Sequence, residues 1–288
     1  MTIHFTKMHG IGNDYIYVDC TKNMLPDPAG VAIAMSPRHF SVGSDGLVLI
    51  CPSEIADANM RMFNADGSEG KMCGNAIRCV GKFLFDHGLV SKTTILVETK
   101  SGTKRLTLSV KNGEVAAVRV NMGKAELAPE KIPVTLTGDK IVGFETTVGG
   151  EVHKITCVSM GNPHNVIFTD DPYGLDLEKI GPGFENDPLF PERVNTEFVR
   201  LTGKNELTMR VWERGSGETW ACGTGATAVC VATIMLGHAG KKGEELTVIA
   251  KGGTLKLTHL ANNHVILRGP AVTVFEGVID IPDEVINK

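Results

Sequence analysis

One long apolar segment stands out among many short apolar runs along the chain. The segment from Ala226 to Leu236 has no charged residue, is apolar nearly all round, and is followed by Gly237. A helix with this pattern is usually buried on every side, and a glycine just after it is typical of a helix end. The stretch from Gly74 to His87 ends in the same way, at Gly88. The pattern therefore predicts two core helices.

Most of the other apolar positions fall in short runs bounded by turn residues, which is typical of strands. We predict strands at 3–8, 15–18, 47–51, 59–63, 94–99, 103–110, 115–121, 134–136, 154–158, 165–168, 196–201, 207–212, 246–250, 254–259, 265–267 and 272–281. Shorter helices are expected at 29–35 and from 176 onward. Strands outnumber helices and short turns join many of them. This favours an α/β (α+β) fold with mixed or antiparallel sheets wrapped around a central helix, over a doubly wound parallel sheet.

Each core helix belongs to a longer repeated stretch. Positions 209–237 match positions 60–88 without a gap, and Cys222 falls on Cys73 (222 − 73 = 149). The same offset places Gly161-Asn162 on Gly12-Asn13. A repeat of this length predicts two pseudo-symmetric domains. We expect residues 1–123 to form the half with Cys73 and 124–276 the half with Cys222, with the C-terminal strand, 277–288, joining the first half.

Composition limits the class of protein. The chain has 288 residues, a net charge of −4 and 42% hydrophobic residues, which is typical of a globular protein with a large core. It has no basic cluster for nucleic acid or an anionic membrane. It has no apolar leader at its N-terminus and no apolar run of membrane-spanning length. The scattered cysteines, without a disulfide pattern, lead us to expect a reducing cytoplasm.

The seven cysteines are widely scattered, odd in number and without a C-x-x-C pair, which argues against a disulfide framework and a zinc site. Cys73 and Cys222 differ from the rest because each directly precedes a core helix. Free backbone N–H groups and the positive end of the helix dipole meet there, so we expect a lowered thiol pKa and a bound anion. For the remaining five we expect buried apolar roles; they are Cys20, Cys51, Cys79, Cys157 and Cys230.

Two equivalent thiols suit one reaction in particular. If two similar domains meet face to face, one sulfur can remove a proton from a carbon acid while the other delivers a proton to the opposite face. This inverts the stereocentre and needs neither a cofactor nor a metal. The chain lacks a Walker-type phosphate loop, and Gly10-x-Gly12 and Gly215-x-Gly217 are too short for dinucleotide fingerprints.

Six segments, MHGIGNDY, FNADGSE, MCGNAIRC, SMGNPH, PERVN and ERGSGETWACGTGA, resemble the pattern of the diaminopimelate epimerase family over the whole chain. The resemblance implies interconversion of LL- and meso-diaminopimelate, a precursor of lysine and peptidoglycan. It implies two α/β domains with a cleft between them, no metal, no pyridoxal phosphate, no other cofactor, and a homodimer. An aromatic residue at the Phe275 position resembles one near dimer contacts in the family.

Carried over by residue, the resemblance makes Cys73 and Cys222 the acid–base pair, with His164 supporting Cys73 and Glu213 supporting Cys222. Backbone N–H groups would hold the carboxylate at the reacting carbon, and a second set of side chains would hold the distal amino-acid end. The first set is Gly74, Asn75, Gly223 and Thr224, and the second is Asn13, Asn64, Asn162, Asn195, Glu213 and Arg214. Gly46 departs from the pattern, because some members carry Gln there.

Several other interpretations remain. Glu69 and Glu218, four residues before their cysteines, fit first-turn or capping carboxylates better than catalysts. The chain could be a related cofactor-independent amino-acid racemase or isomerase of the same fold. A thiol hydrolase or acyl transferase would use one cysteine with a histidine and leave the second cysteine unexplained. A non-enzymatic amino-acid-binding protein would keep Arg214 and the asparagines but would not need both thiols.

Overall fold

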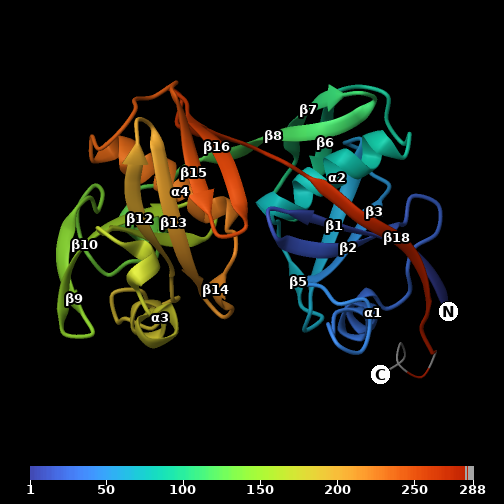
Figure 1. Cartoon of the computed structure of the whole chain (residues 1–288), viewed down its shortest axis with the longest axis horizontal. Helices are drawn as coiled ribbons and strands as arrows, with labels where there is room; N and C mark the ends of the chain where they lie inside the picture. Colours follow the sequence, from blue (N-terminus) through green and yellow to red (C-terminus); the bar gives the residue numbers. More distant parts are fainter. Residues whose placement is uncertain (283, 285–288) are drawn as a thin grey trace. The chain divides into compact units, whose positions relative to one another are not determined.

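The computed structural model describes residues 1–282 and 284 and divides the chain into two compact units. Unit 1 comprises Met1–Val120 together with the C-terminal part from Gly269, and unit 2 comprises Asn121–Arg268. Figure 1 labels the helices and strands of both units.

Unit 1 is a mixed sheet that carries two helices. Its elements are β1 (Thr2–Gly10), β2 (Asn13–Asp19), α1 (Pro28–Met35), β3 (Gly46–Cys51), β4 (Ala58–Asn64), β5 (Glu69–Gly70), α2 (Gly74–Asp86), β6 (Thr94–Glu98), β7 (Lys104–Lys111), β8 (Glu114–Lys124) and β18 (Val272–Asp280). β2 runs parallel to β3, and β4 to β6. The other neighbours are antiparallel: β18 with β1, β1 with β2, β3 with β4, β4 with β5, and β6 through β7 to β8.

Unit 2 repeats this strand order. Its elements are η1 (Pro129–Lys131), β9 (Phe144–Val148), β10 (Glu151–Ser159), β11 (Pro163–Phe168), η2 (Pro172–Gly174), α3 (Leu177–Glu185), β12 (Asn195–Gly203), β13 (Glu206–Glu213), β14 (Gly217–Thr219), α4 (Gly223–Met235), β15 (Glu245–Ala250), β16 (Gly253–His259) and β17 (His264–Gly269). β11 runs parallel to β12 and β13 to β15, and the remaining neighbours are antiparallel.

The two core helices are confirmed. Helix α4 is buried almost throughout and packs against β10, β11, β12, β15 and β16 (Figure 1). Helix α2 is buried from Gly74 to Leu84 and packs against β1, β2 and β7. Gly88 and Gly237 follow their helices with φ of +69° and +70°, the left-handed conformation that glycine adopts without strain. The predicted mixed sheets around central helices are also confirmed.

The internal repeat extends to individual hydrogen-bonded pairs. Adding 149 to both ends of α2 gives both ends of α4. The parallel pair Ile16 and Leu47 becomes Asn165 and Thr196 in the same register. The repeat in the sequence therefore reflects two copies of one backbone arrangement.

Some local predictions were wrong. Residues 134–136 form no strand, because the Val134 N–H donates to the Pro129 carbonyl and the Thr135 N–H to the Leu189 carbonyl. The prediction also missed β9, whose largely exposed sequence FETTV has a weak apolar signal, and the very short strands β5 and β14. Within the described part of the chain, every helix is too short or too polar to cross a membrane.

Candidate functional site

In unit 1, Cys73 is the N-cap residue of α2, as the sequence predicted. Its backbone is extended (φ −129°, ψ 125°), and its sulfur accepts a hydrogen bond from the Ala76 N–H at 3.5 Å. The thiol donates to Asn13 Oδ1, with a sulfur–oxygen distance of 3.3 Å. The helix start therefore holds this sulfur against an amide side chain from the turn between β1 and β2.

The substrate-binding residues predicted in unit 1 lie on three of its elements. Asn13 at the start of β2 donates from Nδ2 to Asp45 Oδ2 at 2.7 Å, which orients its oxygen toward the sulfur. Asn64 ends β4, where its Nδ2 donates to the Ser68 hydroxyl at 2.9 Å. Gly74 and Asn75 open α2, and Asn75 is almost fully buried.

In unit 2, Cys222 is the N-cap of α4, again as predicted. The Gly225 N–H donates to its sulfur at 3.3 Å, and the Thr224 hydroxyl lies 3.4 Å from the same sulfur. The expected lowering of the thiol pKa is wrong for Cys222. Burial, followed by the carboxylates of Glu213 and Glu197, raises the pKa of Cys222 well above its usual value. The hydrogen bonds from the helix start oppose this effect without reversing it.

Glu213, at the end of β13, is the predicted partner of Cys222 and lies beside it in unit 2. It accepts a hydrogen bond from the Thr219 hydroxyl. Burial raises the pKa of Glu213, although hydrogen bonds with Thr219 and Cys222 and the proximity of His164 act in the opposite direction. A half-buried carboxyl with a raised pKa next to a thiol is suited to proton transfer.

His164 on β11 is fully buried in unit 2. Its Nδ1 lies 2.7 Å from Glu197 Oε1, and both side chains are 0% exposed. Its Nε2 lies 3.1 Å from Asn162 Oδ1. The amide of Asn162 then donates to the Thr224 hydroxyl at 3.3 Å. His164 and Asn162 are therefore connected to the start of α4, while the pairing of His164 with Cys73 stays a prediction.

Asn195 and Arg214 meet at the turn that follows β13. Asn195 Oδ1 accepts from the Arg214 backbone N–H at 3.0 Å, and Asn195 Nδ2 donates to the Pro163 carbonyl at 2.9 Å. The Arg214 guanidinium donates through Nη1 to the Glu192 carbonyl at 2.8 Å. Three of the segments used for the sequence comparison, SMGNPH, PERVN and ERGSGET, therefore converge here.

Glu69 and Glu218 do not cap their helices. Glu218 forms two hydrogen bonds with Arg210, at 2.9 and 3.0 Å, and Glu69 forms one with Arg61 at 2.8 Å. These pairs obey the 149 offset. The sequence-based interpretation of these two carboxylates as first-turn or capping groups was wrong, because each faces a guanidinium on the strand before it.

Gly46 has a structural reason to be glycine. It pairs with Asn64 between β3 and β4, and a Cβ at this position would lie 2.0 Å from the Phe63 carbonyl oxygen and 3.0 Å from the Tyr15 ring. A side chain at this position would therefore require the backbone at Phe63 to shift.

Glu197 was not among the site residues predicted from the sequence. It lies on β12 with 0% exposure, and its Oε2 has no hydrogen-bond partner among the described residues. The repeat contained a signal, because the position 149 residues earlier is Val48, a core residue of β3. A carboxylate that replaces an apolar residue on a core strand is unusual enough to mark a candidate site residue.

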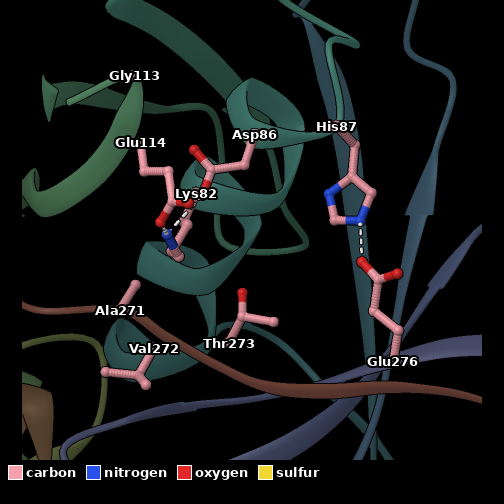
Figure 2. Close-up of a pocket in the computed structure, with 9 residues that line it drawn as sticks. All are labelled: Lys82, Asp86, His87, Gly113, Glu114, Ala271, Val272, Thr273 and Glu276. Carbon is pink, nitrogen blue, oxygen red and sulfur yellow. Dashed lines mark hydrogen bonds and ion pairs between the residues drawn. The ribbon is translucent and has the colours of Figure 1, made fainter. Parts of the chain in front are cut away.

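A surface pocket of unit 1 contains none of the predicted site residues (Figure 2). Its charged side chains pair with each other, with Lys82 Nζ 2.5 Å from Asp86 Oδ2 and His87 Nε2 3.0 Å from Glu276 Oε1. Across residues 1–282 and 284, no group of three or more His, Cys, Asp and Glu side chains is arranged to hold a metal ion. The helix starts therefore remain the candidate site.

Known proteins resemble this chain in sequence and in fold. The family model described as diaminopimelate epimerase matches residues 5–128 and 156–274. A diaminopimelate epimerase from Acetivibrio thermocellus is 52% identical over 280 residues, covering 97% of this chain and 99% of the relative. One from Methanococcus maripaludis (strain S2) is 50% identical over 278 residues, covering 96% and 99%.

Solved structures with much lower identity share the fold. A probable proline racemase from Agrobacterium radiobacter superposes with a TM-score of 0.71 at 15% identity, covering 97% of this chain and 93% of that one. A phenazine biosynthesis protein of the PhzF family from Bacillus anthracis gives 0.68 at 17% identity, covering 98% and 100%. With half of its residues identical to those of curated relatives over nearly its whole length, the chain belongs to the diaminopimelate epimerase family.

Proposed function

We propose that this protein interconverts LL- and meso-diaminopimelate by moving a proton at one α-carbon between two cysteines, without a cofactor. The observation that carries the proposal is the equivalent placement of Cys73 and Cys222, each the N-cap of a buried helix and 149 residues apart. One sulfur, as thiolate, takes the α-proton, and the other, as thiol, delivers a proton to the opposite face.

The electrostatics of unit 2 support a thiol at Cys222 before turnover. Burial and two nearby carboxylates disfavour its thiolate. In the direction in which Cys222 donates a proton, Cys73 must first lose the proton that it donates to Asn13 Oδ1, and its thiolate then removes the α-proton. In the reverse direction Cys222 must lose its proton first, and Glu213 is placed to accept it.

We propose that the starts of α2 and α4 hold the carboxylate of the reacting centre. The groups would be the backbone N–H groups of Gly74, Asn75, Gly223 and Thr224, since four N–H groups at a helix start lack partners within the helix. As negative charge grows on the carboxylate when the α-proton leaves, these donors stabilise it.

The distal amino-acid end of the substrate needs a cation for its carboxylate and acceptors for its ammonium group. We assign this role to Arg214 and Glu213 with four asparagines, namely Asn13, Asn64, Asn162 and Asn195. The bond from the Arg214 backbone to Asn195 supports the assignment, because it holds two of these residues together.

Three wider features belong to the same proposal. We propose a cytoplasmic homodimer, and the exposed apolar side chains of Val274, Phe275 and Val278 on β18 support a subunit contact there. We also propose that the chain acts as two domains, residues 1–123 with 277–288 and residues 124–276; of these, 283 and 285–288 lie outside the described residues. Sedimentation equilibrium tests the dimer, because a monomer at micromolar concentration would exclude it.

Incubation with LL-diaminopimelate tests the function. The purified protein, free of added cofactor, is mixed with the LL isomer, and the isomers are separated by chiral chromatography. We expect LL and meso isomers to approach equilibrium, while proline and lysine keep their configuration. Absence of the meso isomer would refute the proposal, and inversion of proline would favour a broader racemase.

A further inference from the structure

Glu197 is a carboxylate placed where the other half of the molecule has a valine. Its strand register shows this directly, because Glu197 pairs with Val211 on β13 as Val48 pairs with Met62 on β4. At the position of His164, the first half has Tyr15. The buried Glu197–His164 pair is therefore specific to unit 2, and the fold itself does not require it.

Glu197 also touches the start of α4. A Cβ at Gly225 would lie only 2.5 Å from Glu197 Oε1, so the glycine lets the carboxylate approach the first turn of the helix. The equivalent residue in the first half is Ala76, which faces no carboxylate at the equivalent position. Glycine at 225 and glutamate at 197 are thus complementary features of one site.

Three successive contacts connect Glu197 through His164 and Asn162 to Thr224 at the start of α4. His164 Nδ1 lies 2.7 Å from Glu197 Oε1. His164 Nε2 lies 3.1 Å from Asn162 Oδ1, so an acceptor oxygen faces each ring nitrogen. With its oxygen used in this way, Asn162 donates from Nδ2 to Thr224 Oγ1 at 3.3 Å.

The chain of donors ends at the sulfur. Because the Thr224 oxygen accepts from Asn162, its own proton is available for Cys222 Sγ, 3.4 Å away. A hydroxyl that donates to sulfur stabilises the thiolate, and this bond lowers the pKa of Cys222 against the larger effects of burial and the carboxylates. Glu213 on β13 is the other titratable group that faces both His164 and Cys222.

We infer that Glu197 is a positioning residue that keeps His164 a donor at both ring nitrogens, so that Asn162 and Thr224 direct a hydrogen bond onto the Cys222 sulfur. This inference rests on the proposed function for its kinetic consequence. In Glu197→Gln, a neutral His164 ring can still form a hydrogen bond with the side chain at position 197. Its Nε2 would then be an acceptor facing Asn162 Oδ1, and the asparagine amide would turn over and withdraw the donor from Thr224.

The first test is independent of turnover. In the protein labelled with ¹⁵N-histidine, the His164 ring at pH 7 is expected to show two protonated nitrogens, and the ring of Glu197→Gln one. The His164 signal is assigned by its absence from His164→Gln. One protonated nitrogen in the parent protein, or two in Glu197→Gln, would overturn the inference even if the protein proved to have another activity.

The second test is a double-mutant cycle on diaminopimelate epimerisation. Glu197→Gln and Thr224→Val are each expected to lower kcat by roughly 10- to 100-fold, the range for one hydrogen bond to a charged group, with KM changed less than about threefold. The double variant is expected to be no slower than the slower single variant, because both break the same chain. Thr224→Ser should keep most of the activity.

The matched control is Thr196→Val. Thr196 is fully buried next to Glu197 on β12, and its hydroxyl has no partner among the described residues. Successive residues on a strand face opposite sides. The Thr196→Val change therefore alters the same strand on its other side and leaves the hydrogen bonds that begin at Glu197 in place. We expect normal kcat from this variant. Multiplicative losses in the cycle, or an equal loss in Thr196→Val, would contradict a positioning role for Glu197.

Discussion

Replacing Arg210 by Ala should destabilise unit 2 far more than the equivalent change destabilises unit 1. Arg210 makes four hydrogen bonds: two to Glu218, at 2.9 and 3.0 Å, and two to the carbonyls of Pro172 and Leu175, at 2.8 and 2.6 Å. The side chains of Arg210 and Glu218 are only 12% and 14% exposed. The alanine variant leaves a nearly buried carboxylate and two carbonyls without this donor.

The repeat supplies the matched control, Arg61→Ala. Arg61 donates one hydrogen bond to Glu69, is 35% exposed, and leaves Glu69 paired with Lys100 at 2.5 Å. Breaking a buried ion pair costs about 3–5 kcal/mol, and the slight exposure of Arg210 favours the lower end. Exposed pairs contribute about 0.2–1 kcal/mol, which sets the expected cost for Arg61→Ala.

Tryptophan fluorescence during urea unfolding separates the two cases, because both tryptophans, Trp212 and Trp220, belong to unit 2. We expect Arg210→Ala to lower the midpoint of this transition by the equivalent of about 3 kcal/mol. Arg61→Ala should leave it nearly unchanged, and far-UV circular dichroism, which reports on both units, detects any loss of stability in unit 1. Equal shifts of the tryptophan transition in the two variants would refute this reasoning.

Three further predictions follow from individual side chains. Gly46→Gln should lower the thermal midpoint by the equivalent of at least about 3 kcal/mol, because its Cβ would collide with the Phe63 carbonyl. The control Gly88→Ala, with open space around it, should lower it far less, and equal losses would contradict the steric argument. Glu213→Gln should stabilise unit 2 increasingly as pH rises above about 4.3. Burial raises the pKa of Glu213, so in the parent the unfolded chain ionises first and folding loses stability with pH. A urea midpoint difference that stays constant from pH 4 to 7 would count against a raised pKa. Arg214→Ala should cost about 2–5 kcal/mol in kcat/KM for diaminopimelate, and unchanged kinetics would remove Arg214 from the substrate site.

Much of the fold could be predicted because local signals and the repeat agreed. The starts of α2 and α4 were predictable, since a cysteine, a glycine and an apolar run recur 149 residues apart. The strands with clear apolar runs were also predictable. The exposed strand β9 was not, because FETTV has too few apolar residues, and 134–136 was wrongly included because loop hydrogen bonds hold its apolar residues.

The chemistry of the site was less predictable than its location. The helix start alone predicts a lowered pKa for the Cys222 thiol, yet burial and the carboxylates of Glu213 and Glu197 reverse the direction. Those carboxylates lie on β13 and β12, and their distance from the sulfur depends on tertiary packing. Glu197 could be recognised only by comparing the two halves, where it replaces Val48.

Solvent deuterium incorporation tests the two-thiol mechanism most directly. LL-diaminopimelate is incubated with the protein in heavy water and quenched early, and each isomer is analysed for deuterium at the α-carbon. We expect meso product that carries solvent deuterium at the inverted centre and recovered LL isomer that stays largely unlabelled, because the donor thiol exchanges with solvent before turnover. Product that retains the original proton, or near-normal epimerisation by Cys73→Ala or Cys222→Ala, would contradict proton transfer by two cysteines.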